Sequence, residues 1–285
     1  IDSIRIYPQS IVIDIASVKT ELKLKVESLF GISDKYVPTH PMAGKAVGGA
    51  INASVDLLMD RRWVLCPSEH TSRDQLSVIE KLVTDCGSTP IYMSTETHDA
   101  AVAVTSHLPQ LLSTVLAGQL ENLSDQEVAV SGPGLRDMTR LASSDMTLWL
   151  QIIKSNNRYI AEALSLFSRD LQVLQNSLSI YDFAEIEGSF QRGLAGRKRI
   201  PGKHGDRQQQ YAIVAVLIDD KPGQLAGIFA CAGEANINIE DVRIDHALGR
   251  EVAIVELSIK PEKVKALQEA LLREGWSLRP VNNAD

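Results

Sequence analysis

The stretch SIVIDIAS at residues 10–17, followed by VKTELKLKVESLF at residues 18–30, decides the fold of the first third of the chain. The first part is a short apolar run with β-branched residues, which is typical of a buried strand. The second part has apolar residues near helical spacing and ends at Gly31, a suitable stop signal for a helix. A strand followed closely by a helix is the basic unit of an α/β domain.

The same alternation continues to about residue 96. The sequence predicts a strand at Arg62–Cys66, a helix from Thr71 to about Cys86, and another strand at Thr89–Met93. Strands that alternate with helices favour a parallel sheet with helices on its faces. Ile1 is not an initiator methionine, and little precedes the first strand that could pair with it. We therefore expect residues 1–96 to be the later part of an α/β domain whose beginning lies upstream of Ile1.

The pattern becomes helical from residue 97 to about residue 187. Helices are predicted at residues 98–120, after Pro133-Gly134, at residues 146–155 and at residues 157–178. The last helix carries a narrow apolar seam, suited to pairing with another helix, formed by Leu164, Phe167, Leu171, Leu174 and Leu178. The seam predicts either packing within the chain or a homodimer interface.

The C-terminal part has a pattern of its own. Residues 188–210 lack periodicity and are rich in glycine, arginine and lysine, which predicts a solvated linker. Residues 211–285 then follow the order strand, helix, strand, strand, helix, strand. Pro261 stands where the first turn of a helix tolerates proline, and Gly275 stands where helices commonly end. This βαββαβ order predicts a ferredoxin-like sandwich.

The composition bounds the class of protein. A chain of 285 residues with 44% hydrophobic content is long enough for two or three domains with cores of their own. The net charge of −7 argues against nucleic acid or an anionic membrane surface as the main partner. No apolar run approaches the roughly 18 residues of a spanning helix, and we expect no signal peptide. We therefore expect a cytoplasmic protein. The three cysteines are far apart and predict neither a disulfide framework nor a metal site.

Two polar residues stand where a ligand of the predicted sheet would bind. Ser17 follows the first strand, at the carboxyl end, where open parallel sheets place their ligands. It is also a candidate N-cap for the next helix. His40 lies in THPMAG at residues 39–44, predicted to be a loop. An imidazole with a pKa near neutral suits a general base, although a loop histidine taken alone is more often an ordinary surface residue.

Further polar residues interrupt the predicted helices. His107 and Gln110 are three positions apart on the helix at residues 98–120 and therefore face the same way, while Pro109 breaks the hydrogen-bond ladder of that helix. Asp137 and Arg140 have the spacing of an ion pair. An arginine held in this way is suited to bidentate binding of a carboxylate. A capped kink and a surface ion pair are the structural alternatives.

Together, these segments resemble the prephenate dehydrogenase family, which includes arogenate and cyclohexadienyl dehydrogenases. The motifs occur in the family's order and are DIASVK at 14–19, HPMAG at 40–44, HD at 98–99, SHLPQ at 106–110, and GLRDMTRLASSD at 134–145 with Trp149 after it. The resemblance covers about residues 11–205. It implies a partial Rossmann-type dinucleotide-binding domain in residues 1–96. It also implies an all-helical substrate and dimerisation domain in residues 97–187, and a homodimer formed through that domain.

The resemblance also implies a reaction, the NAD(P)-dependent oxidative decarboxylation of prephenate to 4-hydroxyphenylpyruvate in tyrosine biosynthesis. By motif, His40 is the base, and Ser17 hydrogen-bonds His40 and contacts the cofactor. Arg140 binds a substrate carboxylate, with further substrate contacts from His107, Gln110 and Asp137. NAD is the expected cofactor, and NADP stays open because the phosphate loop G-x-G-x-x-G would lie upstream of Ile1.

One departure from the family pattern bears on the substrate. The helix motif usually reads S-H-L-P-H, and its second histidine is Gln110 here. Glutamine is never cationic, so its contact with an anionic side chain is weaker. Arogenate, which carries an amino-acid side chain, is therefore the alternative substrate. A non-catalytic truncated fragment that binds tyrosine is a further alternative.

Residues 211–280 resemble an ACT domain, a small-ligand regulatory module, in DDKPGQLAGIF at 219–229 and NINIEDVRI at 236–244. The resemblance implies feedback regulation, with the pathway product tyrosine as effector. Asp220, Gln224 and Asn238 stand where such domains usually contact their ligand. Turn and cap roles are the alternative for these residues, and Asp220 fits a turn role better.

Overall fold

The structure is a computed structural model that describes residues 10–31, 34–44, 53–201, 211–246 and 251–280. The chain divides into two compact units, residues 1–189 and residues 190–285. The first unit contains an α/β part and a helical part, and the second contains a four-stranded sheet.

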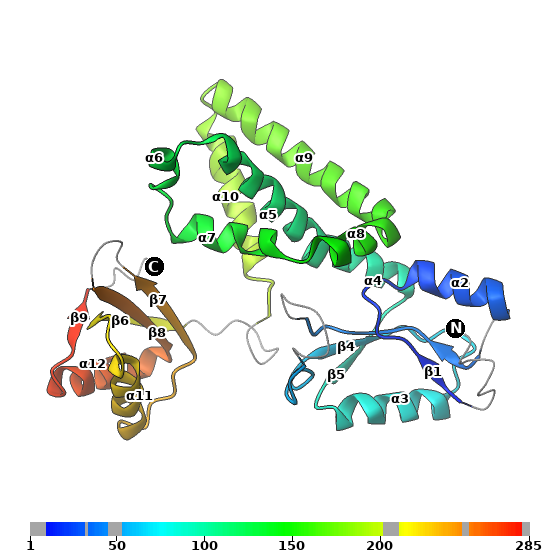
Figure 1. Ribbon diagram of the computed structural model, residues 1–285, viewed down its shortest axis with the longest axis horizontal. Coiled ribbons are helices and arrows are strands. Elements are labelled where there is room, and N and C mark those ends of the chain that lie inside the picture. The colour runs from blue at the N-terminus through cyan, green and yellow to red at the C-terminus, as the bar shows by residue number, and fades with distance from the viewer. Residues whose placement is uncertain (1–9, 32–33, 45–52, 202–210, 247–250, 281–285) are drawn as a thin grey trace. The chain divides into compact units, whose positions relative to one another are not determined.

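The α/β part consists of short strands and two flanking helices. These elements are β1 (Val12–Ile13), α2 (Thr20–Phe30), β2 (Tyr36–Val37), β3 (Thr39–Pro41), β4 (Arg62–Leu65), α3 (Arg73–Asp85) and β5 (Thr89–Tyr92). Ile79 and Val83 of α3 are buried in one apolar core with Trp63 and Leu65 of β4. Figure 1 shows α3 on one face of the strands and α2 on the other.

The expectation of a wholly parallel sheet was wrong in one strand pair. β1 pairs with β2, and β4 with β5, in parallel, but β3 runs antiparallel to β4. A parallel pair needs a long crossover, whereas an antiparallel pair does not. No helix is described between β3 and β4 that would provide such a crossover. The α/β part therefore has mixed strand directions.

The helical part begins with a capped helix. The Ser94 side chain accepts a hydrogen bond from the Thr97 N–H and caps α4 (Thr95–Val102). The chain continues through a π-helical turn, η2 (Ala103–His107), into α5 (Leu108–Gly118) and η3 (Gln119–Asn122). Pro109 has no N–H to donate, and the wider turn directly before it accommodates this gap. The helix predicted at residues 98–120 is thus interrupted next to Pro109, as the proline indicated.

In the part of the chain that the structure describes, one helical stretch, Thr95–Asn122, is long and apolar enough to cross a membrane. The sequence expectation that nothing approaches this length was therefore wrong. A single stretch of this kind is weak support for a membrane segment, because the core helix of a globular domain meets the same criteria. Buried polar side chains lie along it, among them His98 and His107.

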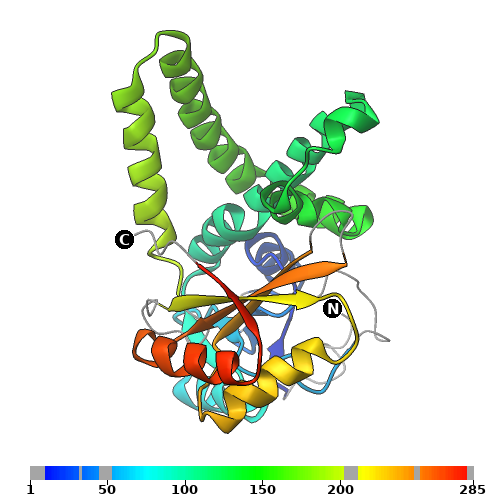
Figure 2. The same cartoon turned by 90° about the vertical axis from the view of Figure 1, so that its left-hand side faces the viewer.

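The remaining helices follow along the chain, and the last of them crosses the boundary between the two units at residues 189 and 190. They are α6 (Asp125–Val128), α7 (Pro133–Thr139), η4 (Arg140–Ser143), α8 (Met146–Ser155), α9 (Asn157–Ser179) and α10 (Phe183–Arg197). The bounds of α8 and α9 agree with the predictions. In Figure 2, α9 and α10 run antiparallel to each other.

The prediction that residues 188–210 form a linker was wrong for the first ten of them, because residues 188–197 belong to α10. The predicted boundary cut through a helical pattern that starts earlier, in which Phe183, Ile186, Phe190 and Leu194 recur at helical spacing. The three glycines of α10 lower the helix propensity without ending the helix. Residues 202–210 of the predicted linker lie outside the described residues.

The second unit has the element order strand, helix, strand, strand, helix, strand. Its elements are β6 (Ala212–Asp219), α11 (Gln224–Glu234), β7 (Asp241–His246), β8 (Val252–Ile259), η5 (Pro261–Lys263), α12 (Val264–Arg273) and β9 (Ser277–Arg279). The strands form one antiparallel sheet in the order β7-β8-β6-β9. Both helices cover the same face of the sheet (Figure 2). Gly227 permits close packing there, because a Cβ atom at this position would lie 2.8 Å from the Trp276 ring.

Candidate active site

His40 lies in the short strand β3 and not in a loop, as the sequence analysis expected. Its strand neighbour is Val64 of β4. β3 is the edge strand of its sheet, and an edge strand tolerates the missing N–H of Pro41. The strand therefore fixes the backbone on which the His40 imidazole stands.

A buried polar network fastens the start of β3 to the loop after β1. The Lys19 ammonium group, which is fully buried, pairs with Asp14 and donates to the Thr39 carbonyl at 2.6 Å. The Asp14 carboxylate also accepts from the Tyr36 hydroxyl at 2.8 Å. Burial lowers the pKa of Lys19, while Asp14 acts in the opposite direction. Removal of one member of such a pair leaves a buried charge without its counter-ion, so the network holds β3 in place.

His40 begins a hydrogen-bonded chain that runs into α4. Nδ1 of His40 lies 2.8 Å from Nε2 of His98, and Nδ1 of His98 lies 2.8 Å from Oδ1 of Asp99. His98 and Asp99 are both fully buried. By the family motifs, Ser17 was the predicted group that orients His40. In the structure, the nitrogen of His40 that is hydrogen-bonded meets His98 instead.

Asp99 also holds the N-terminus of α2. Its carboxylate accepts from the Lys19 N–H at 2.9 Å and from the Thr20 N–H at 2.8 Å. Burial raises the pKa of Asp99, but hydrogen bonds from His98, Thr20 and Lys19 lower it more, so the net pKa is lowered. The charged carboxylate thus satisfies N–H groups at the positive end of the helix. Ser17 is not the N-cap, because α2 begins at Thr20.

His40 and His107 have lowered pKa values and are neutral at pH 7. The pKa of His40 is lowered to about 3, first by burial and then by His98, Lys19 and His107, with Asp99 opposing. The pKa of His107 is lowered to about 4, first by burial, with Asp99 opposing and His98 adding to the decrease. A neutral imidazole has a lone pair on one ring nitrogen and can accept a proton there.

His107 lies against a different set of groups. Its Nδ1 lies 3.0 Å from Nδ2 of Asn156, which also donates to the Asp99 carbonyl at 2.9 Å. The Trp149 ring stands edge-on to the imidazole, with centroids 5.9 Å apart. Asn156 connects α8 to α9, so three helices meet at His107.

Gln110 has structural hydrogen bonds at both ends of its amide, contrary to the expectation of a substrate contact. Nε2 donates to the Leu141 carbonyl at 2.7 Å, and Oε1 accepts from the Ser144 hydroxyl at 3.3 Å. The side chain is buried. Gln110 and His107 also contact different segments, although their spacing predicted a common face. Gln110 therefore anchors η4, the segment that begins with Arg140.

Arg140 and Asp137 lie at the junction of α7 and η4, and both are exposed. Exposure leaves the Arg140 guanidinium accessible to a ligand. Because Gln110 donates to the carbonyl of Leu141, the residue that follows Arg140, the backbone next to Arg140 is fixed even though its side chain is solvated.

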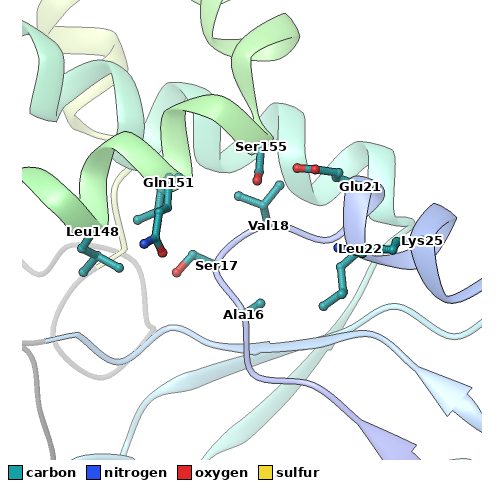
Figure 3. A pocket seen from close by; sticks show the side chains of 10 residues that line it. Ala16, Ser17, Val18, Glu21, Leu22, Lys25, Leu148, Gln151 and Ser155 are labelled. Atoms are coloured by element: carbon teal, nitrogen blue, oxygen red, sulfur yellow. The ribbon is translucent and has the colours of Figure 1, made fainter. Parts of the chain in front are cut away.

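Ser17 lines a cleft of about 380 Å³ between the loop after β1, α2 and α8 (Figure 3). Ser17 and Gln151 lie on facing sides of this cleft in Figure 3. Its lining residues are Ala16, Ser17, Val18, Glu21, Leu22, Lys25, Leu148, Gln151, Ile152 and Ser155. This volume is in the range of small-molecule sites. The hydroxyl of Ser17 and the amide of Gln151 can hydrogen-bond a polar ligand there.

Sequence reasoning missed the site roles of His98, Asp99 and Asn156. The HD motif at 98–99 indicates the family and predicts no role for either residue. The signal in the sequence was weak, because His98 and Asp99 are the fourth and fifth residues of a helix whose first turn is already polar. Asn156 gave a weaker signal as the residue between two predicted helices.

The predicted regulatory residues are dispersed in the second unit. Gln224, the first residue of α11, lines a cavity of about 310 Å³ together with Trp276. Asp220 lies in the turn before α11, and Asn238 lies in the loop before β7. Asn238 donates to Glu240 at 2.9 Å. Neither Asp220 nor Asn238 lines the cavity that Gln224 lines.

The buried histidines predict acid sensitivity of the fold. The pKa values of His40 and His107 fall from 6.5 to about 3 and about 4, so between these values the unfolded chain binds protons that the folded chain does not. Stability therefore rises with pH in this range; it is fully present above pH 6.5 and is lost as pH falls toward the folded values. We expect the melting temperature to decrease from pH 7 to pH 4.5, measured by circular dichroism. A double variant, His40→Gln with His107→Gln, should show a flatter decrease, and equal slopes would contradict the assignment.

Comparisons with known proteins define the class of the first unit. Residues 3–92 match the prephenate dehydrogenase nucleotide-binding domain, and residues 94–192 match the prephenate dehydrogenase dimerization domain. The class is thus a nucleotide-binding α/β domain followed by a helical dimerisation domain. The chain belongs to the prephenate dehydrogenase family, and the two matches cover most of its length.

Individual relatives agree with this family. The chain is 28% identical over 282 residues to the probable prephenate dehydrogenase NovF of Streptomyces niveus, with 95% of this chain and 77% of that protein covered. It is 24% identical over 237 residues to the prephenate dehydrogenase of Bacillus subtilis (strain 168), with 82% and 64% covered. The chain therefore spans about two thirds to three quarters of the length of these relatives.

Solved structures with similar folds belong to the same family. The prephenate dehydrogenase from A. aeolicus, in complex with hydroxyphenyl propionate and NAD+, has a TM-score of 0.59 and 28% identity, with 65% of each chain covered. The arogenate dehydrogenase of Synechocystis has a TM-score of 0.59 and 27% identity, with 67% of this chain and 69% of that chain covered.

Proposed function

We propose that this protein oxidises and decarboxylates prephenate to 4-hydroxyphenylpyruvate, with NAD+ as the hydride acceptor. The observation that carries the proposal is the buried chain from His40 through His98 to Asp99. It places an oriented, neutral imidazole in the α/β part of a chain of this family. A general base of this kind is the group that the reaction requires.

The reaction needs one proton acceptor and good orientation. Prephenate is a cyclohexadienyl ring with a 4-hydroxyl group, a ring carboxylate and a pyruvyl side chain. His40 accepts the hydroxyl proton while C4 loses a hydride and becomes a carbonyl carbon. The bond to the ring carboxylate then breaks, its electron pair completes the aromatic ring, and CO2 leaves. His40 returns its proton to the phenolate oxygen and is restored.

The low pKa of free His40 suits this cycle once the substrate is bound. Burial keeps the ring neutral and therefore ready to accept a proton. The substrate carries two carboxylates, and negative charge near an imidazole raises its pKa. Binding thus brings the pKa of His40 closer to the working pH, where a general base is most effective.

The cleft at Ser17 fits the cofactor's reactive end. Bound NAD+ would supply the hydride acceptor. Ser17 and Gln151 would hydrogen-bond its polar groups from the two sides of the cleft, and Leu148 and Ile152 would contribute apolar surface. The cleft is of small-ligand size and has both apolar walls and polar groups, as such sites generally do.

Arogenate is the second candidate substrate, favoured by the likeness to the Synechocystis arogenate dehydrogenase. The test is a steady-state assay of the enzyme with both substrates. We expect the specificity constant kcat/KM to be larger for prephenate by at least about tenfold, a difference of roughly 1.4 kcal/mol. A larger constant for arogenate would reverse the assignment.

We further propose that the protein is a homodimer through its helical part. Apolar side chains of α9 and α10 remain exposed, among them Leu171, Leu178, Phe183, Phe190 and Leu194. Exposed apolar surface of this extent on neighbouring helices is typical of an interface. Light scattering should give twice the mass of the chain.

We also propose that the second unit is an ACT-type domain that mediates inhibition by tyrosine. Its βαββαβ order and antiparallel sheet support a ferredoxin-like sandwich, and the cavity at Gln224 offers space for a small ligand. For inhibition, tyrosine must bind the inactive arrangement more tightly than the active one.

Deletion of residues 211–285 tests this role. We expect the deletion to abolish tyrosine inhibition and to leave activity at low tyrosine largely intact, because the cut lies after α10 and outside the first unit. The measurement is the rate with prephenate at increasing tyrosine for both proteins. Unchanged inhibition in the truncated enzyme would place the tyrosine site in the catalytic unit.

A further inference from the structure

Asp99 contacts both His98, the partner of His40, and Asn156, the partner of His107. Its carboxylate accepts from the Lys19 and Thr20 N–H groups and from Nδ1 of His98, and its backbone carbonyl accepts from Asn156. An ionised carboxylate and a carbonyl oxygen can only accept hydrogen bonds. The atom that faces each of these Asp99 oxygens must therefore carry the hydrogen.

Through the carboxylate, Asp99 determines the protonation of His40. Nδ1 of His98 must carry a hydrogen, so a neutral His98 has its lone pair on Nε2. That nitrogen lies 2.8 Å from Nδ1 of His40, and two lone pairs do not meet at this distance. Nδ1 of His40 therefore carries the hydrogen. Nε2 of His40 is left with the lone pair, as a proton acceptor.

Through the carbonyl, Asp99 determines the protonation of His107. The Asn156 atom 2.9 Å from this carbonyl must be the nitrogen, because the carbonyl cannot donate. This orientation leaves the buried Oδ1 of Asn156 without a partner among the described residues, so the contacts of Nδ2 are what fix it. The second hydrogen of Nδ2 points to Nδ1 of His107, 3.0 Å away, which must accept. A neutral His107 then carries its hydrogen on Nε2.

We propose that Asp99 is a positioning residue that holds the two histidines in opposite tautomers. His40 is held as a proton acceptor at Nε2, and His107 as a hydrogen-bond donor at Nε2. The inference deepens the proposed function, because an acceptor for the hydroxyl proton and a neutral donor for a substrate oxygen are complementary groups. The Lys19 N–H fixes the orientation of the Asp99 carboxylate. His98 and Asn156 transmit the effect of Asp99 to His40 and His107.

Nitrogen NMR tests the tautomers directly and without activity. The protein contains six histidines, so ¹⁵N-histidine labelling with single His→Gln variants for assignment is practical. At pH 7.5 we expect Nδ1 of His40 and His98 to show the chemical shift of a protonated nitrogen, and Nε2 the shift of an unprotonated one. His107 should show the reverse pattern. Protonation of both nitrogens in His98, or of Nδ1 in His107, would overturn the proposal.

Kinetics of Asp99→Asn provide the second test. The amide has one acceptor oxygen where the carboxylate has two, so it cannot accept from His98, Lys19 and Thr20 together, and the tautomer of His98 is no longer fixed. We expect kcat to fall by roughly 10³–10⁴-fold, the usual effect of a wrong histidine tautomer in an Asp–His pair. A kcat within about tenfold of the unmodified enzyme would contradict the proposal.

Two variants at position 98 distinguish loss of the tautomer from a folding defect. In His98→Gln, the side-chain oxygen can still accept from Nδ1 of His40, whereas His98→Leu offers no acceptor. We expect His98→Leu to lose kcat as Asp99→Asn does and His98→Gln to recover most of it. Equal losses in both would overturn the tautomer role. If His40→Asn retained turnover, His40 would not be the base. The NMR pattern would still test whether His40 and His107 have opposite tautomers.

Discussion

We expect His40→Asn to lower kcat with prephenate by roughly 10²–10⁴-fold, the usual contribution of a general base. Asparagine has an amide nitrogen near the position of Nδ1, so it can still donate to His98 and keep the buried chain intact. It has no group at the position of Nε2 that can accept the hydroxyl proton. The loss should therefore appear in kcat, with a much smaller change in substrate binding.

The measurement is steady-state kinetics at saturating NAD+, with circular dichroism as the check on folding. His70→Asn is a suitable control, because His70 is half exposed and lies outside the histidine cluster. It should behave as the unmodified enzyme. Near-normal turnover of His40→Asn would mean that another group accepts the proton.

The sequence was sufficient for the longer elements of the fold. α8 and α9 were predicted at their observed bounds, since each has apolar residues at helical spacing over several turns. The helix predicted from Thr71 begins at Arg73, where Ser72 and Gln75 form a reciprocal pair at the helix start. Such signals are local, and local patterns are what a single sequence displays.

Short elements and long-range contacts were not predictable in the same way. β3 has three residues, one of them proline, so no alternating pattern could reveal it. His40 and His98 are 58 positions apart, and their contact depends on how α4 meets the strands. The motifs predicted His40 as the base and Ser17 as its orienting partner, whereas the structure pairs His40 with His98. Ser17 is close in the motif order and lines the cleft instead.

Gln110 shows how a departure from a family motif can mislead. Its position in the motif suggested a substrate contact weakened by loss of charge. The structure instead gives the amide two partners in the segment 141–144, which a neutral donor and acceptor can satisfy simultaneously. A cationic histidine has no acceptor atom for the Ser144 hydroxyl. Packing against η4 therefore explains a glutamine at this position.

The second large effect is expected at Arg140. A bidentate carboxylate contact in a desolvated site contributes about 2–5 kcal/mol to binding, which corresponds to roughly 30-fold to several thousandfold in affinity. Arg140 is exposed in the structure, and solvent screening reduces the strength of such a contact. We therefore expect Arg140→Ala to raise the KM for prephenate by about 30-fold, at the lower end of the range, while NAD+ binding is unaffected. Arg136→Ala is the matched control, since Arg136 is an exposed arginine one turn earlier, in α7, and its removal should leave KM unchanged. Equal KM values for the two variants would mean that Arg140 is an ordinary surface arginine, and that the substrate carboxylate binds elsewhere in the site.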